Sequence, residues 1–354
     1  MKKKDKKKFK RKNVKIQNLN INDIEAFEET DIIEDNRSAK KNLGKAEFSS
    51  KSNLKLKKGR VLEVKSNNTF FVEIGDEKLE CYLSGRLKQL NYKTRTLIAV
   101  GDYVNVDFAE EPRIEEILPR KNSLSRFSEN NFQSEVIIAS NVDQVIVTTS
   151  VKEPDLNLGL VDRYICTARL FDIVPVVCVN KIDIAEDFEL LKNEMEFYSK
   201  SKIKVIFCSA ETGYGLEELK ALLANKQSVF SGLSGTGKSS LINKLQPDLN
   251  LRVADVSDVT SKGVHTTTSA KLIEWDFGGY LVDTPGIKTF GLHRDDKHKI
   301  SRIFPGIDLL YEECKFDDCS HDHEAECAVL NAVEKGEFPV ERYNSYVRLL
   351  ESLQ

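Results

Sequence analysis

The stretch from Gly232 to Ser240, Gly-Leu-Ser-Gly-Thr-Gly-Lys-Ser-Ser, has the residue types that bind nucleotide phosphates. It fits the pattern G-x-x-x-x-G-K-[ST]. Glycines allow successive N–H groups to point at phosphate oxygens, the lysine neutralises the β- and γ-phosphates, and the serine hydroxyl binds Mg²⁺. A Gly/Ser-rich turn is the alternative, but an apolar run precedes the motif and a helical pattern follows it. The expected nucleotide contacts here are Gly232, Leu233, Ser234, Gly235, Thr236, Gly237, Lys238, Ser239 and Ser240.

Two short motifs follow other apolar runs and have the residue types that recognise guanine. In Asn180-Lys-Ile-Asp183, the Asp183 carboxylate can accept hydrogen bonds from guanine N1–H and the exocyclic amine, a donor pair that adenine lacks. Asn180 can bond the base edge, and the stem of Lys181 can cover the ring face. Ser209-Ala210 is typical of the segment that supports the guanine carbonyl. Each motif alone also suits an ordinary polar loop, but together they predict a guanine site.

Asp283-Thr-Pro-Gly286 follows a further apolar run and supplies the groups expected around the γ-phosphate. Asp283 is a candidate magnesium ligand beside Ser239, and the Gly286 N–H is expected to reach the γ-phosphate. Combined with the phosphate loop and the guanine motifs, this segment predicts that the bound nucleotide is GTP with Mg²⁺.

The segment Gly263-Val-His-Thr-Thr-Thr268 lies where a switch that senses the γ-phosphate is expected. One of its threonines, Thr266, Thr267 or Thr268, should bind Mg²⁺. Ile287 stands where Ras-like enzymes have a glutamine that orients water, so another group must do so. His265 is the candidate catalytic residue, because an imidazole can orient or deprotonate water. A solvent-exposed histidine without a role is the alternative.

Three cysteines and two histidines cluster near the C-terminus, from Cys314 to Cys327. Three thiolates and one imidazole make a closed, tetrahedral zinc site of the structural type. In a chain whose other cysteines lie singly in apolar segments, this spacing favours metal over disulfides. The alternative is free cysteines in a loop. One structural Zn²⁺ is therefore expected, with Cys314, Cys319 and Cys327 as ligands and His321 or His323 as the fourth.

The elements that must position these groups follow from periodicity. Residues 1–57 are charged and poor in aromatics, with a Lys-rich start, which predicts a disordered tail. Residues 58–120 hold short β-like runs separated by turn residues, which predict an all-β barrel of the OB type, either an RNA-binding surface or an ordinary soluble one. Residues 125–293 alternate strand and helix patterns, which predict a mostly parallel α/β sheet with ligands at its carboxyl edge. Residues 294–354 read as a small helical unit clamped by zinc.

The composition limits the class of protein and the cellular location that we expect. The net charge of the 354 residues is only −3, with 40% hydrophobic residues, so the chain can form real cores and is not a polycation. No apolar run is long enough to span a bilayer. The basic start lacks the apolar stretch of a signal peptide. We therefore expect a cytoplasmic protein that does not bind membranes.

The order of the motifs is unusual, since the guanine motif at Asn180 precedes the phosphate loop and Asp283-Thr-Pro-Gly286 comes last. With a barrel before and a Cys/His cluster after, residues 58–350 resemble the small-ribosomal-subunit-dependent, circularly permuted GTPases of the RsgA/YjeQ family. Asn141-Val-Asp143, Gly263–Thr268 and Arg342-Tyr343 add to the resemblance.

The resemblance implies several things about this chain. It implies a GTPase, expected here to be a monomer, that binds the small ribosomal subunit and its rRNA during late maturation and is stimulated by that subunit. It also supports His265 as catalytic, favours Thr267 for magnesium, and selects His321 for zinc.

Two readings of other classes stay open at this point. A P-loop small-molecule kinase or ATPase would share the phosphate loop, although the guanine motif argues against both. A zinc-stabilised RNA-binding protein with vestigial nucleotide turnover would bind ribosomes regardless of its nucleotide state.

Overall fold

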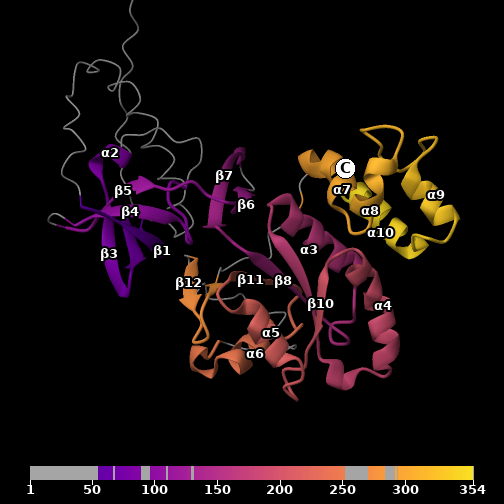
Figure 1. Ribbon diagram of the computed structural model, residues 1–354, viewed down its shortest axis with the longest axis horizontal. Coiled ribbons are helices and arrows are strands. Elements are labelled where there is room, and N and C mark those ends of the chain that lie inside the picture. Colours follow the sequence, from indigo (N-terminus) through magenta and orange to yellow (C-terminus); the bar gives the residue numbers. More distant parts are fainter. Residues whose placement is uncertain are drawn as a thin grey trace, which may run out of the picture. The chain divides into compact units, whose positions relative to one another are not determined.

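A computed structural model describes residues 55–66, 68–88, 96–108, 111–128, 131–251, 270–283, 292 and 294–353 (Figure 1). The tail expected over residues 1–57 lies almost wholly outside the described residues, as do His265, Thr267 and Gly286. Among the described helices, none combines the length and the apolar character that a membrane crossing requires.

The first part of the described chain is a closed five-stranded barrel. Strand β1 pairs with both β2 and β4, β2 pairs with β3, and β3 and β4 meet at β5. Alternate residues of β2, Phe70, Val72 and Ile74, point inward and are buried. The predicted OB-type barrel is confirmed. Its elements are β1 (Leu56–Ser66), β2 (Thr69–Ile74), β3 (Glu77–Leu83), α2 (Gly85–Lys88), β4 (Tyr103–Asp107) and β5 (Arg113–Ile117).

A parallel sheet follows, in the order β10-β9-β8-β11-β13, with β12 antiparallel beside β13. The predicted, mostly parallel α/β sheet is therefore confirmed. Its strands are β8 (Gln144–Ser150), β9 (Val174–Asn180), β10 (Lys204–Phe207), β11 (Gln227–Ser231), β12 (Lys271–Glu274) and β13 (Tyr280–Asp283). Its helices are α3 (Leu158–Leu170), α4 (Phe188–Lys200), α5 (Leu216–Leu223) and α6 (Lys238–Leu245).

Helices cover both faces of this sheet, and the alternation within each strand explains why. Val145 and Val147 of β8 join a core with Ile165 of α3 and Met195 of α4. Ile146, between those valines, faces the opposite core, which includes residues of α5 and α6. Successive side chains of a strand point to opposite faces, so a run of apolar residues is buried on both sides.

Two features of the strands were not predicted. A hairpin of β6 (Ser123–Ser128) and β7 (Asn131–Ser140) connects the barrel to the parallel sheet, and the apolar run at residues 136–139 was its one local signal. In addition, β1 of the barrel pairs with β12, so the barrel strands and the parallel sheet form one continuous ladder. That pairing joins residues far apart in sequence, which local patterns do not reveal.

The C-terminal part is helical and has a core of its own. Phe304, Ile307, Val329 and Tyr346 pack there with two of the zinc-candidate cysteines and with Cys166 of α3. Its helices are α7 (Lys297–Ile303), α8 (Ile307–Leu310), α9 (Ala328–Glu334) and α10 (Val340–Glu351). The 3₁₀ turns along the described chain are η5 (Ile182–Ile184), η6 (Pro247–Leu249), η8 (Arg294–Asp296) and η9 (Tyr311–Glu313).

Candidate functional site

The predicted nucleotide motifs meet at the carboxyl edge of the parallel sheet. Asn180 and Asp283 are the last residues of β9 and β13. Gly232 directly follows β11, and Ser209 comes shortly after β10. These strands are all parallel, so their carboxyl ends lie along one edge, which is where open α/β sheets bind ligands.

The glycines of the phosphate loop are required by close backbone approaches. At Gly232, with φ of +146°, a Cβ would lie 2.0 Å from the Thr148 carbonyl oxygen. At Gly237, with φ of +86°, it would lie 2.2 Å from the Asn180 amide nitrogen. Any side chain at either position would therefore displace the loop from β8 or from the guanine motif.

The loop leads directly into α6, which begins at Lys238. The Lys238 ammonium donates to the carbonyls of Gly232 and Leu233 at 2.9 and 2.6 Å, so it lies across the loop. Ser239 and Ser240 occupy the first turn, Leu233 and Ser234 are exposed, and the Thr236 hydroxyl donates to Leu233 at 2.9 Å. Exposed loop amides at a helix N-terminus form an anion site.

Asn180 ties the guanine motifs to the phosphate loop. Its side-chain nitrogen donates to the Thr236 carbonyl at 2.9 Å, and its side-chain oxygen accepts from the Ala210 amide at 3.2 Å. The Ser209 hydroxyl donates to the Asp183 carboxylate, which orients that carboxylate. The structure thus brings all three predicted segments into one hydrogen-bonded unit.

Asp283 and Ser239 are oxygen donors of the kind Mg²⁺ prefers. Asp283 ends β13, and Ser239 follows the loop after the adjacent strand β11, so both lie at the same edge. Burial raises the pKa of Asp283, and the charge of Lys271 partly offsets that rise. A partly buried carboxylate of this kind gains most from a nearby cation, and so the donor set fits magnesium.

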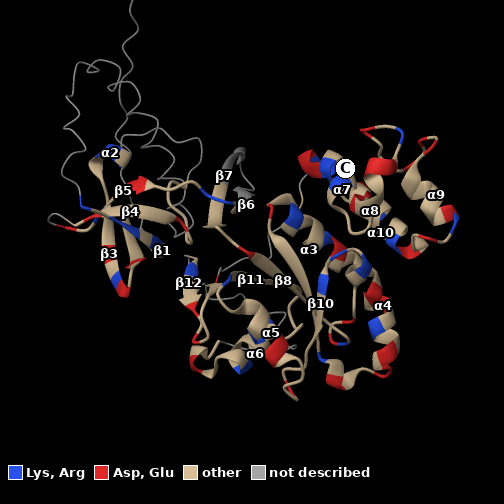
Figure 2. Cartoon of the chain, viewed as in Figure 1, with Lys and Arg blue, Asp and Glu red and all other residues tan. Residues whose placement is uncertain are grey.

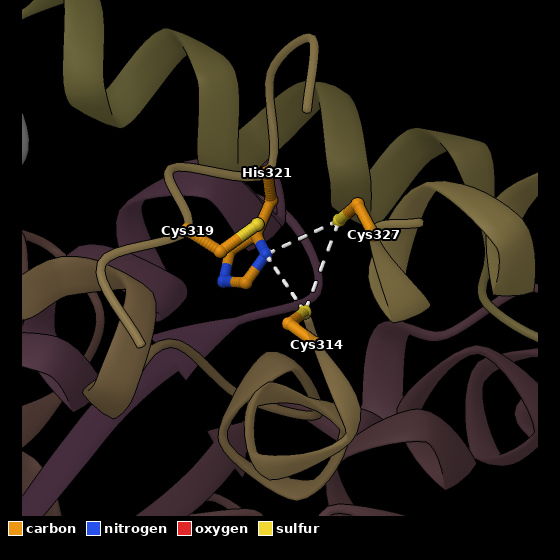
Figure 3. A group of neighbouring side chains, drawn as sticks. All are labelled: Cys314, Cys319, His321 and Cys327. Atoms are coloured by element: carbon orange, nitrogen blue, oxygen red, sulfur yellow. Dashed lines mark hydrogen bonds between the residues drawn. The ribbon is translucent and has the colours of Figure 1, made fainter. Parts of the chain in front are cut away.

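The four predicted zinc ligands converge in the C-terminal part, with ligand atoms all within 4.8 Å of one another (Figure 3). The His321 Nδ1 lies 3.6 Å from the Cys314 sulfur and 3.4 Å from the Cys327 sulfur, and those two sulfurs are 4.0 Å apart. A tetrahedral zinc with Zn–S bonds of about 2.3 Å and Zn–N bonds of about 2.0 Å has edges of about 3.5 to 3.8 Å. The cluster is therefore the right size for one Zn²⁺.

The surroundings of the cluster suit a metal centre. Burial raises the pKa of Cys319 to about 12 and lowers that of His321, so burial disfavours the Cys319 thiolate and the charged imidazolium, and a bound cation would favour the thiolate. Tyr343 and Tyr346 of α10 donate to the carbonyls of His321 and Ser320 at 2.8 and 2.7 Å, which fixes the ligand loop. The side chain of His323 is 82% exposed, in keeping with its exclusion from the ligand set.

Sequence reasoning missed the loop between β8 and α3, which borders the nucleotide site. The Lys181 ammonium donates to the Glu153 carbonyl, and a Cβ on Gly235 would lie 3.4 Å from Pro154. The Ser150 hydroxyl donates to the Pro154 carbonyl at 2.7 Å and holds the loop to β8. Its residues form no known motif, so only its position after a strand could have predicted that this loop borders the nucleotide site.

A basic cavity of about 730 Å³ lies beside this cluster of three cysteines and His321. Helix α7 and the turn before it provide most of its charge (Figure 2). The Arg302 guanidinium lies over the Tyr311 ring, 5.0 Å from its centre. Such a surface favours a phosphate-bearing partner. Its basic residues are Arg294, Lys297, His298, Lys299 and Arg302.

Comparison with known proteins agrees with this arrangement. Residues 117–293 match the RsgA GTPase family. The chain is 38% identical over 282 residues to the small ribosomal subunit biogenesis GTPase RsgA of Flavobacterium psychrophilum, covering 77% of this chain and 86% of that one. The chain belongs to the RsgA GTPase family. A second relative with the same name, from Thermotoga maritima, is 37% identical over 280 residues, 78% of this chain and 90% of that one.

Solved structures of the family have the same fold. YjeQ from Thermotoga maritima superimposes with a TM-score of 0.68 at 34% identity, covering 84% of this chain and 98% of that one. YloQ, described as a circularly permuted GTPase, superimposes with a TM-score of 0.66 at 26% identity, covering 86% and 97%. The permuted order predicted from the motifs is therefore confirmed at the level of the fold.

Proposed function

We propose that this protein binds the small ribosomal subunit and hydrolyses GTP during late maturation of that subunit, with hydrolysis stimulated by the subunit. The observation that carries the proposal is the convergence of the guanine, phosphate and magnesium motifs at one sheet edge. The name of the curated relatives, small ribosomal subunit biogenesis GTPase, supports the choice of partner.

The residues of the chain have distinct parts in the proposed reaction. Asp183 selects guanine, and the hydrogen bonds of Asn180 hold the guanine motif against the phosphate loop. Lys238 and the loop amides stabilise charge on the phosphates, which is the main requirement of phosphoryl transfer. Ser239, Thr267 and Asp283 would hold magnesium, which would supply positive charge to neutralise the phosphates.

His265 is proposed to orient the attacking water or accept its proton, and Gly286 to contact the γ-phosphate. Both fall outside the described residues, as does Thr267. The proposal for His265 rests on the sequence, because Ile287 has no group that binds water. With no fixed glutamine in that place, intrinsic turnover should be slow until the small subunit is bound.

The proposed partner surfaces are the barrel and the basic cavity beside the zinc cluster. Arg86 and Lys88 of α2 lie on the barrel, and Arg302 and Lys299 border the cavity. Both surfaces suit the phosphates of rRNA.

We propose domain limits of 1–57 for the tail, 58–120 for the barrel, 125–293 for the GTPase domain and 294–354 for the zinc domain. We also propose that the protein is monomeric and cytoplasmic.

The proposal is tested by measuring GTP hydrolysis by the purified protein alone, with small ribosomal subunits and with large subunits, beside a Lys238→Ala control. We expect strong stimulation by small subunits only, which the control abolishes. A His265→Ala variant should keep nucleotide binding and lose the stimulated rate. An unchanged rate with small subunits would remove the ribosome as the activator.

A further inference from the structure

Three charged residues form a row across three adjacent strands, one of which belongs to the barrel. Glu63 of β1 pairs with Lys271 of β12, and Lys271 pairs with Asp283 of β13. Directly opposite residues of antiparallel strands project to the same face, with Cβ atoms about 5 Å apart. The Lys271 ammonium lies 3.0 Å from the Glu63 carboxylate. One ammonium therefore stands between the barrel carboxylate and the candidate magnesium ligand.

The strands that carry this row are held together firmly. The Arg60 guanidinium of β1 lies 4.4 Å from the centre of the Tyr280 ring of β13 and donates to Gln227 of β11. The Tyr280 hydroxyl donates to Glu73 of β2. These contacts fix β1 beside β11 and β13, the strands that end at the nucleotide site. A movement of β1 therefore affects the positions of those two strands.

We propose that Lys271 is a positioning residue for the magnesium site, and that Glu63 of the barrel sets how strongly Lys271 competes with the cation for Asp283. This inference rests on the proposed GTPase function. While Glu63 binds the ammonium, the Asp283 carboxylate remains available to the cation. When Glu63 moves away, the Lys271 ammonium interacts with Asp283 instead. Its positive charge then repels a Mg²⁺ ion bound at Asp283.

The row gives the barrel a means of acting on the nucleotide site. A partner that draws β1 away from β12 separates Glu63 from Lys271 and weakens Mg²⁺ binding. A partner that keeps the strands together preserves it. Glu63–Lys271 is the register contact between β1 and β12, so a shift of β1 relative to β12 acts directly on this ion pair.

The test compares Glu63→Gln, Lys271→Met and the double variant. For each, the dissociation rate of a fluorescent, non-hydrolysable GTP analogue is measured across a Mg²⁺ titration at neutral pH, which gives the half-saturating Mg²⁺ concentration. We expect that concentration to rise about threefold in Glu63→Gln and to fall about threefold in Lys271→Met, the size typical of a partly exposed ion pair. The double variant should resemble Lys271→Met, and Lys271→Arg should resemble wild type.

The matched controls are Lys78→Met and Glu274→Gln. The Lys78 ammonium and the Glu274 carboxylate, 2.5 Å apart, also join the barrel to β12, but Glu274 pairs with Tyr280 rather than Asp283. Their removal should leave the half-saturating Mg²⁺ concentration unchanged. All variants should release the analogue at the wild-type rate in EDTA, because the effect acts through the cation.

Opposite shifts in the two single variants support the inference. Equal shifts in one direction, or no shift, would overturn it, because loss of a structural contact weakens the site whichever partner is removed. If wild type binds the analogue without any dependence on Mg²⁺, the magnesium site proposed at Ser239 and Asp283 is wrong, and the inference fails with it, whereas the proposed function is tested separately by the hydrolysis measurements.

Discussion

Arg342 and Asp162 form an ion pair across 180 residues of sequence, with the guanidinium Nη1 donating to the carboxylate at 2.8 Å. Asp162 lies on α3 and is fully buried, and it also accepts hydrogen bonds from Tyr198 at 2.7 Å and from Ser345 at 2.6 Å. Arg342 and Ser345 belong to α10, so this network joins the C-terminal helical part to the sheet. A buried carboxylate with so many partners is sensitive to the loss of any one of them.

The first prediction is that Arg342→Met destabilises the protein by about 3–5 kcal/mol, because it leaves the Asp162 carboxylate buried without a counter-ion. Urea unfolding followed by circular dichroism measures the change. Arg348→Met is the matched control, since Arg348 lies on the same helix and is exposed. Asp162→Asn combined with Arg342→Met should cost less than Arg342→Met alone, and an equal or larger cost would contradict the argument.

The second prediction concerns pH. Burial raises the pKa of Asp162, and the charge of Arg342 opposes that rise. A carboxyl whose pKa is raised in the folded state stabilises the fold fully below its unfolded pKa, about 3.9, and loses that contribution as pH rises through the folded pKa. Arg342→Met raises this pKa further. Its stability deficit relative to wild type should therefore shrink as the pH is lowered toward the unfolded pKa, as measured by urea unfolding. A deficit that is constant over this range would show that Asp162 charge is not its cause.

The third prediction separates two glycines of the phosphate loop. Gly237→Ala should abolish GTP binding, because the new Cβ would lie 2.2 Å from the Asn180 amide nitrogen. Gly235→Ala should weaken binding less, because its nearest neighbours would be 3.4 and 3.6 Å away, although φ is positive at both positions. Titration with a fluorescent GTP analogue compares the affinities of the two variants. Equal losses of affinity would mean that backbone strain, and not the close approach to Asn180, causes the effect.

The fourth prediction tests base recognition. Asp183→Asn should shift the preference of the site from guanosine to xanthosine triphosphate, since an amide at this position can donate to the xanthine carbonyl. Competition binding with both nucleotides measures the shift. Glu186→Gln, nearby and with a side chain 82% exposed, should leave the preference unchanged. If Asp183→Asn still favoured guanosine triphosphate, another residue would have to read the base.

The fifth prediction concerns the metal. His321→Ala should lose Zn²⁺ and increase hydrogen exchange over residues 314–353, because the loop and α10 are linked through the ligands and the Tyr343 hydroxyl. His323→Ala should retain the metal. Elemental analysis of the purified variants gives the zinc content, and exchange is followed by mass spectrometry. A zinc-free His323→Ala protein would show that the ligand assignment is wrong.

The local patterns of the sequence determined much of the result. Short apolar runs ending in Gly232, Asn180, Ser209 and Asp283 were enough to predict a parallel sheet with a nucleotide edge, because strand ends and motif residues are neighbours in sequence. The convergence of Cys314, Cys319, His321 and Cys327 was also predictable, since these residues fall within one short segment. The four remaining cysteines are buried, as their apolar surroundings indicated.

Contacts between residues far apart in the sequence could be seen only in the tertiary structure. The Asp162–Arg342 pair, the pairing of β1 with β12 and the row from Glu63 to Asp283 each join residues far apart in the chain. In their local sequence Asp162, Glu63 and Lys271 look like ordinary surface residues. Whether a charge is buried, and which partner it meets, depends on strand register and helix packing, and those are properties of the whole fold rather than of any single segment.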